Sequence, residues 1–426
     1  MMLVSLKWLS EYVDVPGDVE AFARRLTMAS AEVERVTRVG GDWDPELVRV
    51  GRVLSVEAHP RADRLRLATV DDGRGEPLRV ICGAPNVREG QLVAFAREGA
   101  RIIDGRSGEP AVLRRATIRG VESAGMVLSE RELGLSDEHE GILELPEEAP
   151  VGEPLSDYMG DVVLDVHVWP NRADLMSMVG IAREVAAIEG AALRPPPEEH
   201  AEAGAPASEA VSISILDPAL CSRYIGAVIE GIRVGPSPRW LQQRLLSAGM
   251  RPISNVVDIT NYVLMELGQP LHAFDLDRLE ERAAGGAPSI EVRPARPGER
   301  LLTLDGEERA LSPEMLVIAD GAGPVALAGV MGGAETEVTE STTRILLEAA
   351  RFQPASIRRT SVGLGLRSES SIRFERGLSP ELCGPGARRA ARRLEQVAGG
   401  RPRPGALDAT PRPPARRPSA ASLDRL

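Results

Sequence analysis

Hydrophobic and polar residues follow different periods in different parts of this chain, and each period predicts a different kind of element. Near the N-terminus, Trp8, Leu9, Tyr12 and Val13 fall on one face of a helix, and the stretch from Val19 to Leu26 repeats that spacing. The first segment is therefore predicted to be helical.

From Val48 to about Leu145 the pattern changes to short apolar runs separated by glycine-rich turns. The runs that read as strands are Val50–Val56, Leu65–Val70, Leu78–Cys82 and Leu92–Ala96. Five or so short strands in about a hundred residues predict a small closed barrel, and the oligonucleotide-binding (OB) fold is one option.

The second half of the chain mixes helical and strand patterns. A helical stretch, Gly180–Ala192, leads into a Pro/Ala/Glu segment that is typical of a linker. Val211–Ile215 then alternates as a strand should, and a mixed region continues to about Gly400. The end, Arg401–Leu426, is rich in Pro and Arg and finishes near Ser422 on what looks like the opening of another element. The predicted fold class is multidomain α+β.

Composition narrows the class of protein. A chain of 426 residues is too long for one ordinary core, and 43% hydrophobic with 27% charged residues is typical of a folded soluble protein. No apolar run approaches the ~20 residues that span a bilayer, and Met1–Lys7 lacks the layout of a signal peptide. We therefore expect a cytoplasmic protein without a membrane segment. The net charge of −12 argues against coating nucleic acid by bulk electrostatics but leaves room for a local RNA-binding surface.

Three scattered cysteines complete the compositional picture. Cys82, Cys221 and Cys383 form no CxxC or Cys/His ligand spacing, so no metal site is expected. We expect them to be reduced and mostly buried.

Two motifs in the barrel region carry a resemblance. His59-Pro-Arg-Ala-Asp-Arg-Leu and Cys82-Gly-Ala-Pro-Asn-Val resemble the tRNA-binding barrel shared by several synthetases and tRNA chaperones. Loop residues at a barrel mouth would offer phosphate contacts and polar edges to an unpaired strand. The candidate tRNA-binding residues are His59, Arg61, Arg64 and Asn86. The alternative is that the glycines and prolines here only shape turns and that Asp63 caps or pairs with Arg66.

Three later stretches carry the chemistry. Val257–Asp275, Ala328–Gly333 and Ile345–Ala350 together resemble the editing site in the beta subunit of bacterial phenylalanyl-tRNA synthetase. That resemblance implies hydrolysis of tyrosine mischarged onto tRNA(Phe). Such a site needs a held water, stabilisation of the oxyanion and an acceptor for the tyrosine hydroxyl, because an apolar pocket distinguishes tyrosine from phenylalanine poorly.

The resemblance also assigns roles within that site. His272, Thr260 and Asn261 match the positions that hold the ester and the water. Glu348 is the candidate acceptor for the hydroxyl, since a carboxylate in an apolar run is costly without a role or a partner. Gly329 would let backbone N–H groups approach the substrate. The alternatives are a satisfied, half-buried imidazole at His272 and a salt bridge from Glu348 to Arg351 or Arg358.

One segment departs from the family pattern. Arg367–Gly377, which includes the candidate substrate-binding residues Ser368 and Ser370, carries Ser370 where Ala is more common and Ile372 where His is more common. The Ala position lines the amino-acid pocket. We therefore hypothesise that Ser370 changes the preference for tyrosine over phenylalanine.

A second signature lies between the barrel and the linker. Val168–Leu175 is similar to a family segment that folds with the N-terminal helices, so the first domain is expected to be discontinuous. Asn171 or Asp174 would cap the following helix, and Arg172 would pair with Asp174 or Glu184 rather than bind RNA. The predicted domains are 1–40 with 153–193, an OB barrel at 41–152, a linker at 194–210, an editing domain at 211–400, and 401–426 as a linker opening a truncated helical domain.

The resemblance covers the whole chain but only about the first half of a full-length beta subunit. It implies a part of phenylalanine–tRNA ligase that binds tRNA(Phe) and edits Tyr-tRNA(Phe), with the alpha subunit as partner in an alpha2beta2 assembly. Aminoacylation would lie in the alpha subunit, and the ATP and Mg²⁺ sites are expected outside this chain, which has no P-loop. The alternatives are a free-standing tRNA-binding or trans-editing protein and a scaffold without catalysis.

Overall fold

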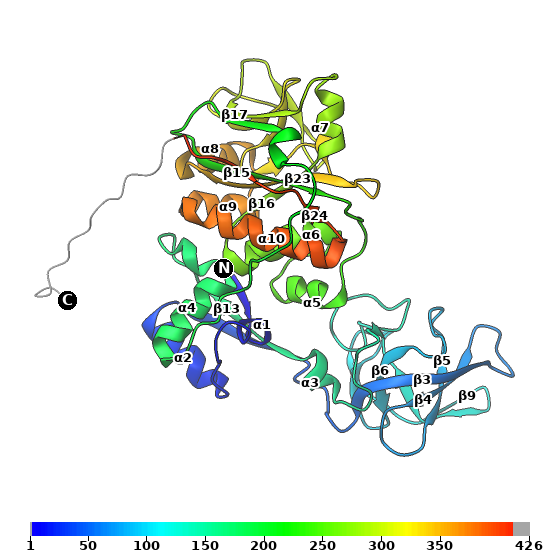
Figure 1. The fold of residues 1–426 in the computed structure, drawn as a ribbon. Coiled ribbons are helices and arrows are strands. Elements are labelled where there is room, and N and C mark those ends of the chain that lie inside the picture. The colour runs from blue at the N-terminus through cyan, green and yellow to red at the C-terminus, as the bar shows by residue number, and fades with distance from the viewer. Residues whose placement is uncertain (1, 412–426) are drawn as a thin grey trace, which may run out of the picture. The chain divides into compact units, whose positions relative to one another are not determined.

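A computed structural model describes residues 2–411, and Figure 1 shows its fold. The element predicted near Ser422 lies outside the described residues. The chain forms two compact units: unit 2 is Val36–Val163, and unit 1 combines the residues before it with those after it. The polypeptide passes between the units in strands β2 (Val33–Val39) and β13 (Asp161–Val166). Unit 1 is therefore discontinuous in sequence.

Unit 2 is built on one antiparallel sheet with the strand order β11-β6-β3-β4-β5, to which β12 adds by pairing with β6. Two small hairpins, β7–β8 and β9–β10, project from it. Its elements are β3 (Val48–Ala58), β4 (Arg66–Asp71), β5 (Leu78–Cys82), β6 (Leu92–Arg97), β7 (Arg101–Ile103), β8 (Pro110–Val112), β9 (Ala116–Ile118), β10 (Val121–Ser123), β11 (Gly125–Val127), β12 (Glu144–Leu145) and α3 (Leu155–Met159).

The two ends of this sheet meet. The Ser123 hydroxyl accepts the Ile81 N–H at 3.0 Å, and the Ala124 N–H donates to the Arg79 carbonyl at 3.1 Å, so β5 is joined to the chain entering β11. Between these ends, β6 is buried on both faces. Phe95 packs in one apolar cluster while Ala94 and its alternate neighbours pack in another, which explains the unbroken apolar run in the sequence.

The N-terminal part of unit 1 is a small sheet with order β1-β13-β2, accompanied by helices. The helices predicted in this segment are present as α1 and α2, but strand β1 precedes the first helix and strand β2 follows the second. The elements are β1 (Met2–Ser5), α1 (Leu6–Leu9), α2 (Val19–Ala29) and α4 (Met178–Glu189). The cap of α4 is Ser177, whose hydroxyl accepts the Gly180 N–H at 3.0 Å, and not Asn171 or Asp174.

The rest of unit 1 consists of two larger sheets, the two-stranded sheet β18–β19 and the helices around them (Figure 1). One sheet has the order β16-β23-β15-β24, with β25 also on β15, and the other has the order β14-β17-β20-β21-β22. The strands are β14 (Ser212–Ile215), β15 (Cys221–Glu230), β16 (Leu271–Asp275), β17 (Ser289–Pro294), β18 (Arg300–Leu302), β19 (Glu308–Ala310), β20 (Leu316–Ala319), β21 (Pro324–Leu327), β22 (Met331–Gly332), β23 (Arg344–Phe352), β24 (Arg401–Pro402) and β25 (Leu407–Ala409). The helices are α5 (Arg239–Ser247), α6 (Asn255–Leu267), α7 (Leu276–Arg282), α8 (Pro354–Leu364), α9 (Glu369–Arg376) and α10 (Cys383–Ala398).

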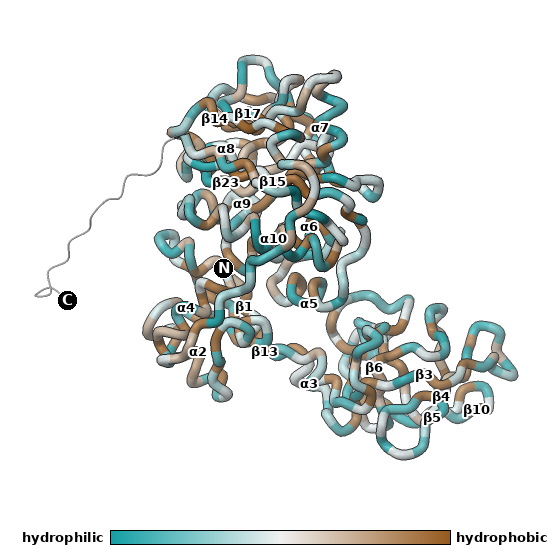
Figure 2. Tube along the Cα trace, in the orientation of Figure 1, coloured by the Kyte–Doolittle hydropathy of each residue, from teal (hydrophilic) through white to brown (hydrophobic). Residues whose placement is uncertain are grey.

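Strand β23 separates two layers of this unit. Alternate side chains of a strand point to opposite faces, so Leu346 and Phe352 enter the core shared with the second sheet, whereas Ala349 faces α10. Figure 2 shows the hydrophobic colour concentrated in these central strands, and teal stretches along α10. Glu348 has the parity of Leu346 and therefore lies on the inner face.

One predicted boundary differs from the structure. Strands β24 and β25 pair with β15, so the sheet continues beyond residue 400 to at least Ala409. The predicted linker 194–210 contains no regular structure except the short 3-10 helix η2 (Ala207–Glu209), and it is tied to α10: Arg388 pairs with Glu198 at 2.6 Å, and Arg392 donates to the Glu199 carbonyl at 2.6 Å. Composition alone predicted a linker, and it could not reveal these contacts with α10.

All three cysteines are buried and unpaired, as expected. Among the described helices, none combines the length and the apolar character needed to cross a membrane.

Candidate active site

The structure brings two of the predicted site residues side by side. His272 on β16 is the direct cross-strand neighbour of Glu348 on β23, and both side chains take the inner face of the sheet. The parity of the two strands sets this arrangement, because Phe274 and Leu346 form the next pair on the same face and enter the core. The sequence places them 76 positions apart, which is the difference between their numbers (348 − 272).

Glu348 is a buried carboxyl group without a cation. Its side chain is 5% exposed, and among the described residues its partner is the Tyr224 hydroxyl, which donates to Oε2 at 3.2 Å. Arg351, the alternative partner, donates instead to the Leu378 carbonyl, and no ion pair joins Glu348 to Arg358 in the described part of the chain. Burial raises the pKa of Glu348 to about 8, against the opposing effect of the Tyr224 hydrogen bond.

His272 is a neutral imidazole with an unused nitrogen. Its Nε2 is buried and has no hydrogen-bond partner among the described residues, while the ring packs edge-on against Phe274 with 4.5 Å between centroids. Burial lowers the pKa of His272 from 6.5 to about 4. At neutral pH the pair is therefore an uncharged base beside a largely protonated acid. A buried polar atom without a partner is costly, which makes it a functional candidate.

Two glycines border this pair in different ways. A Cβ on Gly332 would stand 2.5 Å from His272 Cε1 and 3.0 Å from Leu304 Cδ1, so the backbone passes directly against the imidazole. Gly329 has φ +68°, and a Cβ there would meet Phe374 at 2.8 Å. Gly332 thus touches the site, whereas the contacts of Gly329 lie with the core rings.

The remaining predicted residues form no hydrogen bond with His272 or Glu348 in the described structure. The Thr260 hydroxyl donates to the Val257 carbonyl of its own helix at 2.7 Å, and neither it nor the half-buried Asn261 forms a hydrogen bond with His272 in the described structure. Ser368 caps α9 and donates to the Val330 carbonyl at 3.1 Å, which ties that helix to the glycine-containing turn. Ser370 lies half-buried in the first turn of α9.

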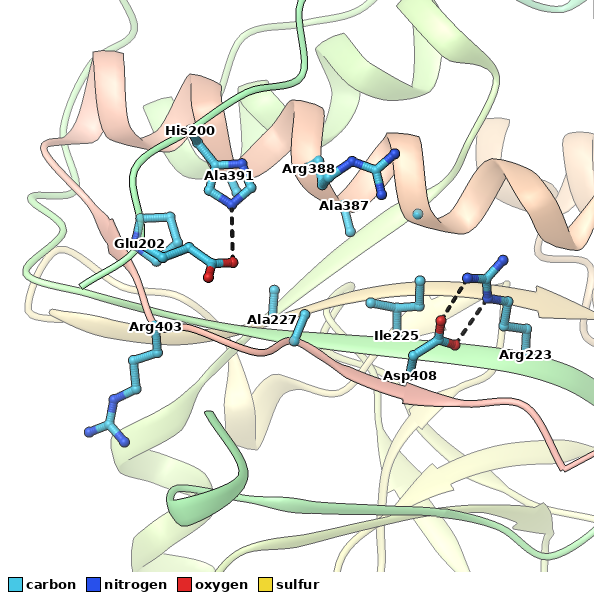
Figure 3. A pocket seen from close by; sticks show the side chains of 13 residues that line it. His200, Glu202, Arg223, Ile225, Ala227, Ala387, Arg388, Ala391, Arg403 and Asp408 are labelled. Carbon is cyan, nitrogen blue, oxygen red and sulfur yellow. Dashed lines mark hydrogen bonds and ion pairs between the residues drawn. The ribbon is translucent and has the colours of Figure 1, made fainter. Parts of the chain in front are cut away.

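The hollow in Figure 3 lies on the other face of the sheet. It measures about 200 Å³ and is lined by Ile225 and Ala227 of β15 and by α10. These residues alternate with Tyr224, so they point away from Glu348. The charged groups around the hollow are already paired, as Arg223 is with Asp408 at 2.6 Å. The hollow is therefore separate from the His272–Glu348 pair.

In unit 2 the four predicted tRNA-binding residues divide into two kinds. His59 is buried, and Asn86 uses its amide on the Ile142 backbone, with bonds of 2.9 and 3.0 Å. These two side chains hold loops together and do not present free edges, which corrects the expectation for both. Arg61 and Arg64 are exposed, and neither forms an ion pair within the described residues. Arg172, in unit 1, pairs with both Asp174 and Glu184, as predicted.

Sequence reasoning missed three contributors. Tyr224 supplies the hydrogen bond to Glu348, Gly226 stands opposite Glu348 on β15, and Leu304 reaches Gly332 from the β18–β19 loop. The period of two in β15 puts Tyr224 and Gly226 on one face, but only the pairing register shows that this face carries Glu348.

Comparison with known proteins adds two families and several relatives. A tRNA-binding domain family matches residues 48–154, and a B3/4 domain family matches residues 220–399. The chain is 50% identical over 410 residues to the phenylalanine–tRNA ligase beta subunit of Dehalococcoides mccartyi (strain CBDB1), covering 96% of the chain and 50% of that relative. Corresponding subunits of Moorella thermoacetica and Anaeromyxobacter dehalogenans are 50% and 49% identical, again over 96% of the chain and 50% of each relative. The chain thus spans about half the length of the curated relatives it matches.

Proposed function

Because the chain belongs to the phenylalanine–tRNA ligase beta subunits and spans about half their length, we propose that it binds tRNA(Phe) and hydrolyses mischarged Tyr-tRNA(Phe). The tRNA-binding domain supports the first activity and the B3/4 domain the second. The observation that carries the proposal is the His272–Glu348 pair, two polar groups held side by side in an apolar core without an ionic partner in the part of the chain that the structure describes.

In this proposal His272 acts on the water. Its unpaired Nε2 accepts a proton as the water oxygen attacks the ester carbonyl, and the proton then passes to the ribose oxygen as the C–O bond breaks. The products are free tyrosine and tRNA(Phe). A pKa of about 4 keeps the imidazole unprotonated and able to accept at neutral pH. Thr260 and Asn261 would hold the ester end, and the backbone beside Gly332 lies next to the imidazole.

Glu348 selects the amino acid in this proposal. A carboxyl group that is largely protonated can both donate to and accept from a phenol, and Tyr224 already holds it in place. Tyrosine satisfies this group, whereas phenylalanine leaves it unpaired in an apolar setting. Gly329, Ser368 and Ser370 would shape the rest of the amino-acid pocket.

The proposal extends to the organisation of the chain and its partners. The closed sheet of unit 2 supports an OB-type barrel with Arg61 and Arg64 on its surface. The family suggests a cytoplasmic alpha2beta2 enzyme whose alpha subunit performs aminoacylation with ATP and Mg²⁺. The family resemblance also leads us to propose that the Mg²⁺ ligands lie elsewhere in the assembly.

The direct test is hydrolysis of Tyr-tRNA(Phe) and Phe-tRNA(Phe) by the purified chain. We expect His272→Ala to slow hydrolysis of the tyrosyl ester by about 10²-fold or more, the usual contribution of acid–base catalysis. Glu348→Ala should remove most of the preference for the tyrosyl over the phenylalanyl ester. His167→Ala, an exposed histidine paired with Glu34 at 3.0 Å, is the matched control and should have no effect. A folded chain that hydrolyses neither ester would contradict the proposal.

A further inference from the structure

The turn that connects β9 and β10 in unit 2 has a sequence that is unusual for its backbone conformation. Val121 pairs with Ile118, which leaves Arg119 and Gly120 as a two-residue turn with φ values of 47° and 81°. Two consecutive positive φ values define the I′ turn, for which Asn-Gly is the preferred sequence. An arginine in the left-handed region is uncommon and costs conformational free energy, which makes this turn a candidate for a functional role.

His59 holds this hairpin against a second loop. Its Nδ1 accepts the Arg61 N–H at 3.1 Å, and its Nε2 lies 3.3 Å from the Ile118 carbonyl. A neutral imidazole protonated on Nε2 satisfies both contacts. Because His59 is 5% exposed, it is a buried link between the loop 59–65 and the hairpin.

The link brings two guanidinium groups to one turn. Arg119 Nη1 lies 3.5 Å from the Arg61 carbonyl, and Arg61 Nη1 lies 2.7 Å from the place where a Cβ of Gly120 would be. Neither arginine has an ion pair among the described residues, and Asp63 on the same loop forms none either. Two adjacent like charges repel, and an anion bound beside both would relieve that repulsion.

The same hairpin provides a contrast. Arg115 is also exposed, but it pairs with Glu122 at 2.6 Å and with Glu98 at 3.3 Å. The hairpin therefore carries one arginine, Arg115, whose charge is neutralised by glutamates, and one, Arg119, without an ion pair in the described structure. Arg61, which lies beside Arg119, has no ion pair there either. In a chain of net charge −12, two neighbouring arginines without ion pairs in the described structure are a local exception to the overall negative charge.

We propose that Arg61 and Arg119 together bind the phosphodiester backbone of RNA, with His59 as the positioning residue that fixes their separation. The inference rests on the proposed tRNA-binding function and deepens it by adding the β9–β10 hairpin, which the sequence motifs did not indicate. Arg64, exposed on the same loop, extends the surface. Recognition is of the charge and spacing of phosphates, not of bases.

The test measures binding of the full chain to a tRNA(Phe) transcript over a series of KCl concentrations. Each lost phosphate contact should reduce the slope of log affinity against log salt by about 0.7–0.9. We expect that reduction from Arg61→Gln and from Arg119→Asn, and none from the control Arg115→Gln. Arg119→Asn is the sharpest variant, because Asn-Gly suits the I′ turn: the protein should melt at a higher temperature yet bind RNA more weakly.

His59→Ala should lower the slope as Arg119→Asn does, whereas a purely structural histidine would lower the melting temperature and leave the slope intact. The inference is overturned if wild type binds with a steep salt dependence that Arg61→Gln and Arg119→Asn leave unchanged, or if Arg115→Gln reduces it equally. A wild-type chain that binds no tRNA(Phe) would instead remove the tRNA-binding function itself, and with it this inference.

Discussion

The described part of unit 1 buries two glutamates that differ in their hydrogen-bond and ionic partners. Glu266 on α6 is fully buried and accepts from Arg389 at 2.6 and 2.7 Å, and from the hydroxyls of Tyr12 at 2.6 Å and Tyr262 at 2.9 Å. Glu348 on β23 is nearly as buried, but within residues 2–411 its one hydrogen-bond partner is the Tyr224 hydroxyl. A buried carboxylate that is paired with a cation and accepts several hydrogen bonds has a structural role. A buried carboxyl group without a cation favours the protonated form and can still bind a ligand.

The matched glutamate joins three parts of the unit. Tyr12 comes from the N-terminal segment, Glu266 from α6 and Arg389 from α10. Around them, Trp8 stacks on Tyr262 at 4.8 Å between ring centroids, and Arg244 lies 5.1 Å from the Trp240 ring. This cluster holds the N-terminal helices against the helical layer of the sheet, and no part of it needs a substrate to be satisfied.

The largest effect should come from Glu266→Ala. Removing the carboxylate leaves Arg389 charged and buried, so the free energy of unfolding of unit 1 should fall by about 3–5 kcal/mol. Urea unfolding followed by the fluorescence of Trp8 and Trp240 would measure it. The exposed Glu308→Ala, which breaks only the surface pair with Arg300, should leave the unfolding midpoint unchanged. A loss no larger than that of the control would break the distinction between the two glutamates.

An intermediate effect should appear in the dependence of stability on pH. Because burial raises the pKa of Glu348 in the folded protein, this group adds to the free energy of unfolding below pH 4.5. That stabilisation is lost as pH rises toward 8. The lowered pKa of His272 means that its contribution is present above pH 6.5 and is lost as pH falls toward 4. The two slopes oppose each other between pH 4.5 and 6.5 and cancel there.

Above pH 6.5 the contribution of Glu348 remains alone, so stability should fall by about 2 kcal/mol between pH 6.5 and 8 at about 1.4 kcal/mol per unit. Glu348→Gln should abolish that fall, which unfolding at a series of pH values would show. If the variant and wild type lose stability in parallel, Glu348 is ionised in the folded state and the comparison with Glu266 fails.

The smallest effect concerns Ser370. If Glu348 is the main acceptor for the tyrosine hydroxyl and Ser370 adds one weak hydrogen bond, Ser370→Ala should change the ratio of tyrosyl to phenylalanyl ester hydrolysis by about threefold. A larger change would give Ser370 a direct share in recognition, and no change at all would reject the hypothesis that it alters the preference. Deacylation assays on the two esters measure the ratio directly.

The two glutamates also show how far sequence reasoning reaches. The cost of a carboxylate in an apolar run pointed to Glu348 in Ile345–Ala350, yet the same argument applies to Glu266 in Val263–Leu267. Only the fold shows that Arg389 lies beside one of them. The strands of unit 2 and the helix α6 were predictable because their periods are local. The pairing of β16 with β23 was not, because register depends on contacts between distant segments.

The same limit explains the barrel residues. The motif around His59 correctly placed a loop beside strand β4, but it could not show that the imidazole turns inward to meet Ile118. Arg119 could not be identified from the sequence, because its positive φ arises from the hairpin register and not from its neighbours in sequence.

Strands β24 and β25 have a practical consequence. They cover the outer edge of β15, a ten-residue strand whose other edge is paired with β23. A fragment that stopped at residue 400 would expose the N–H and C=O groups of that edge, and exposed edges of apolar strands recruit other chains into intermolecular sheets. Such a fragment should aggregate on expression, whereas one carried through Ala409 keeps its edge closed.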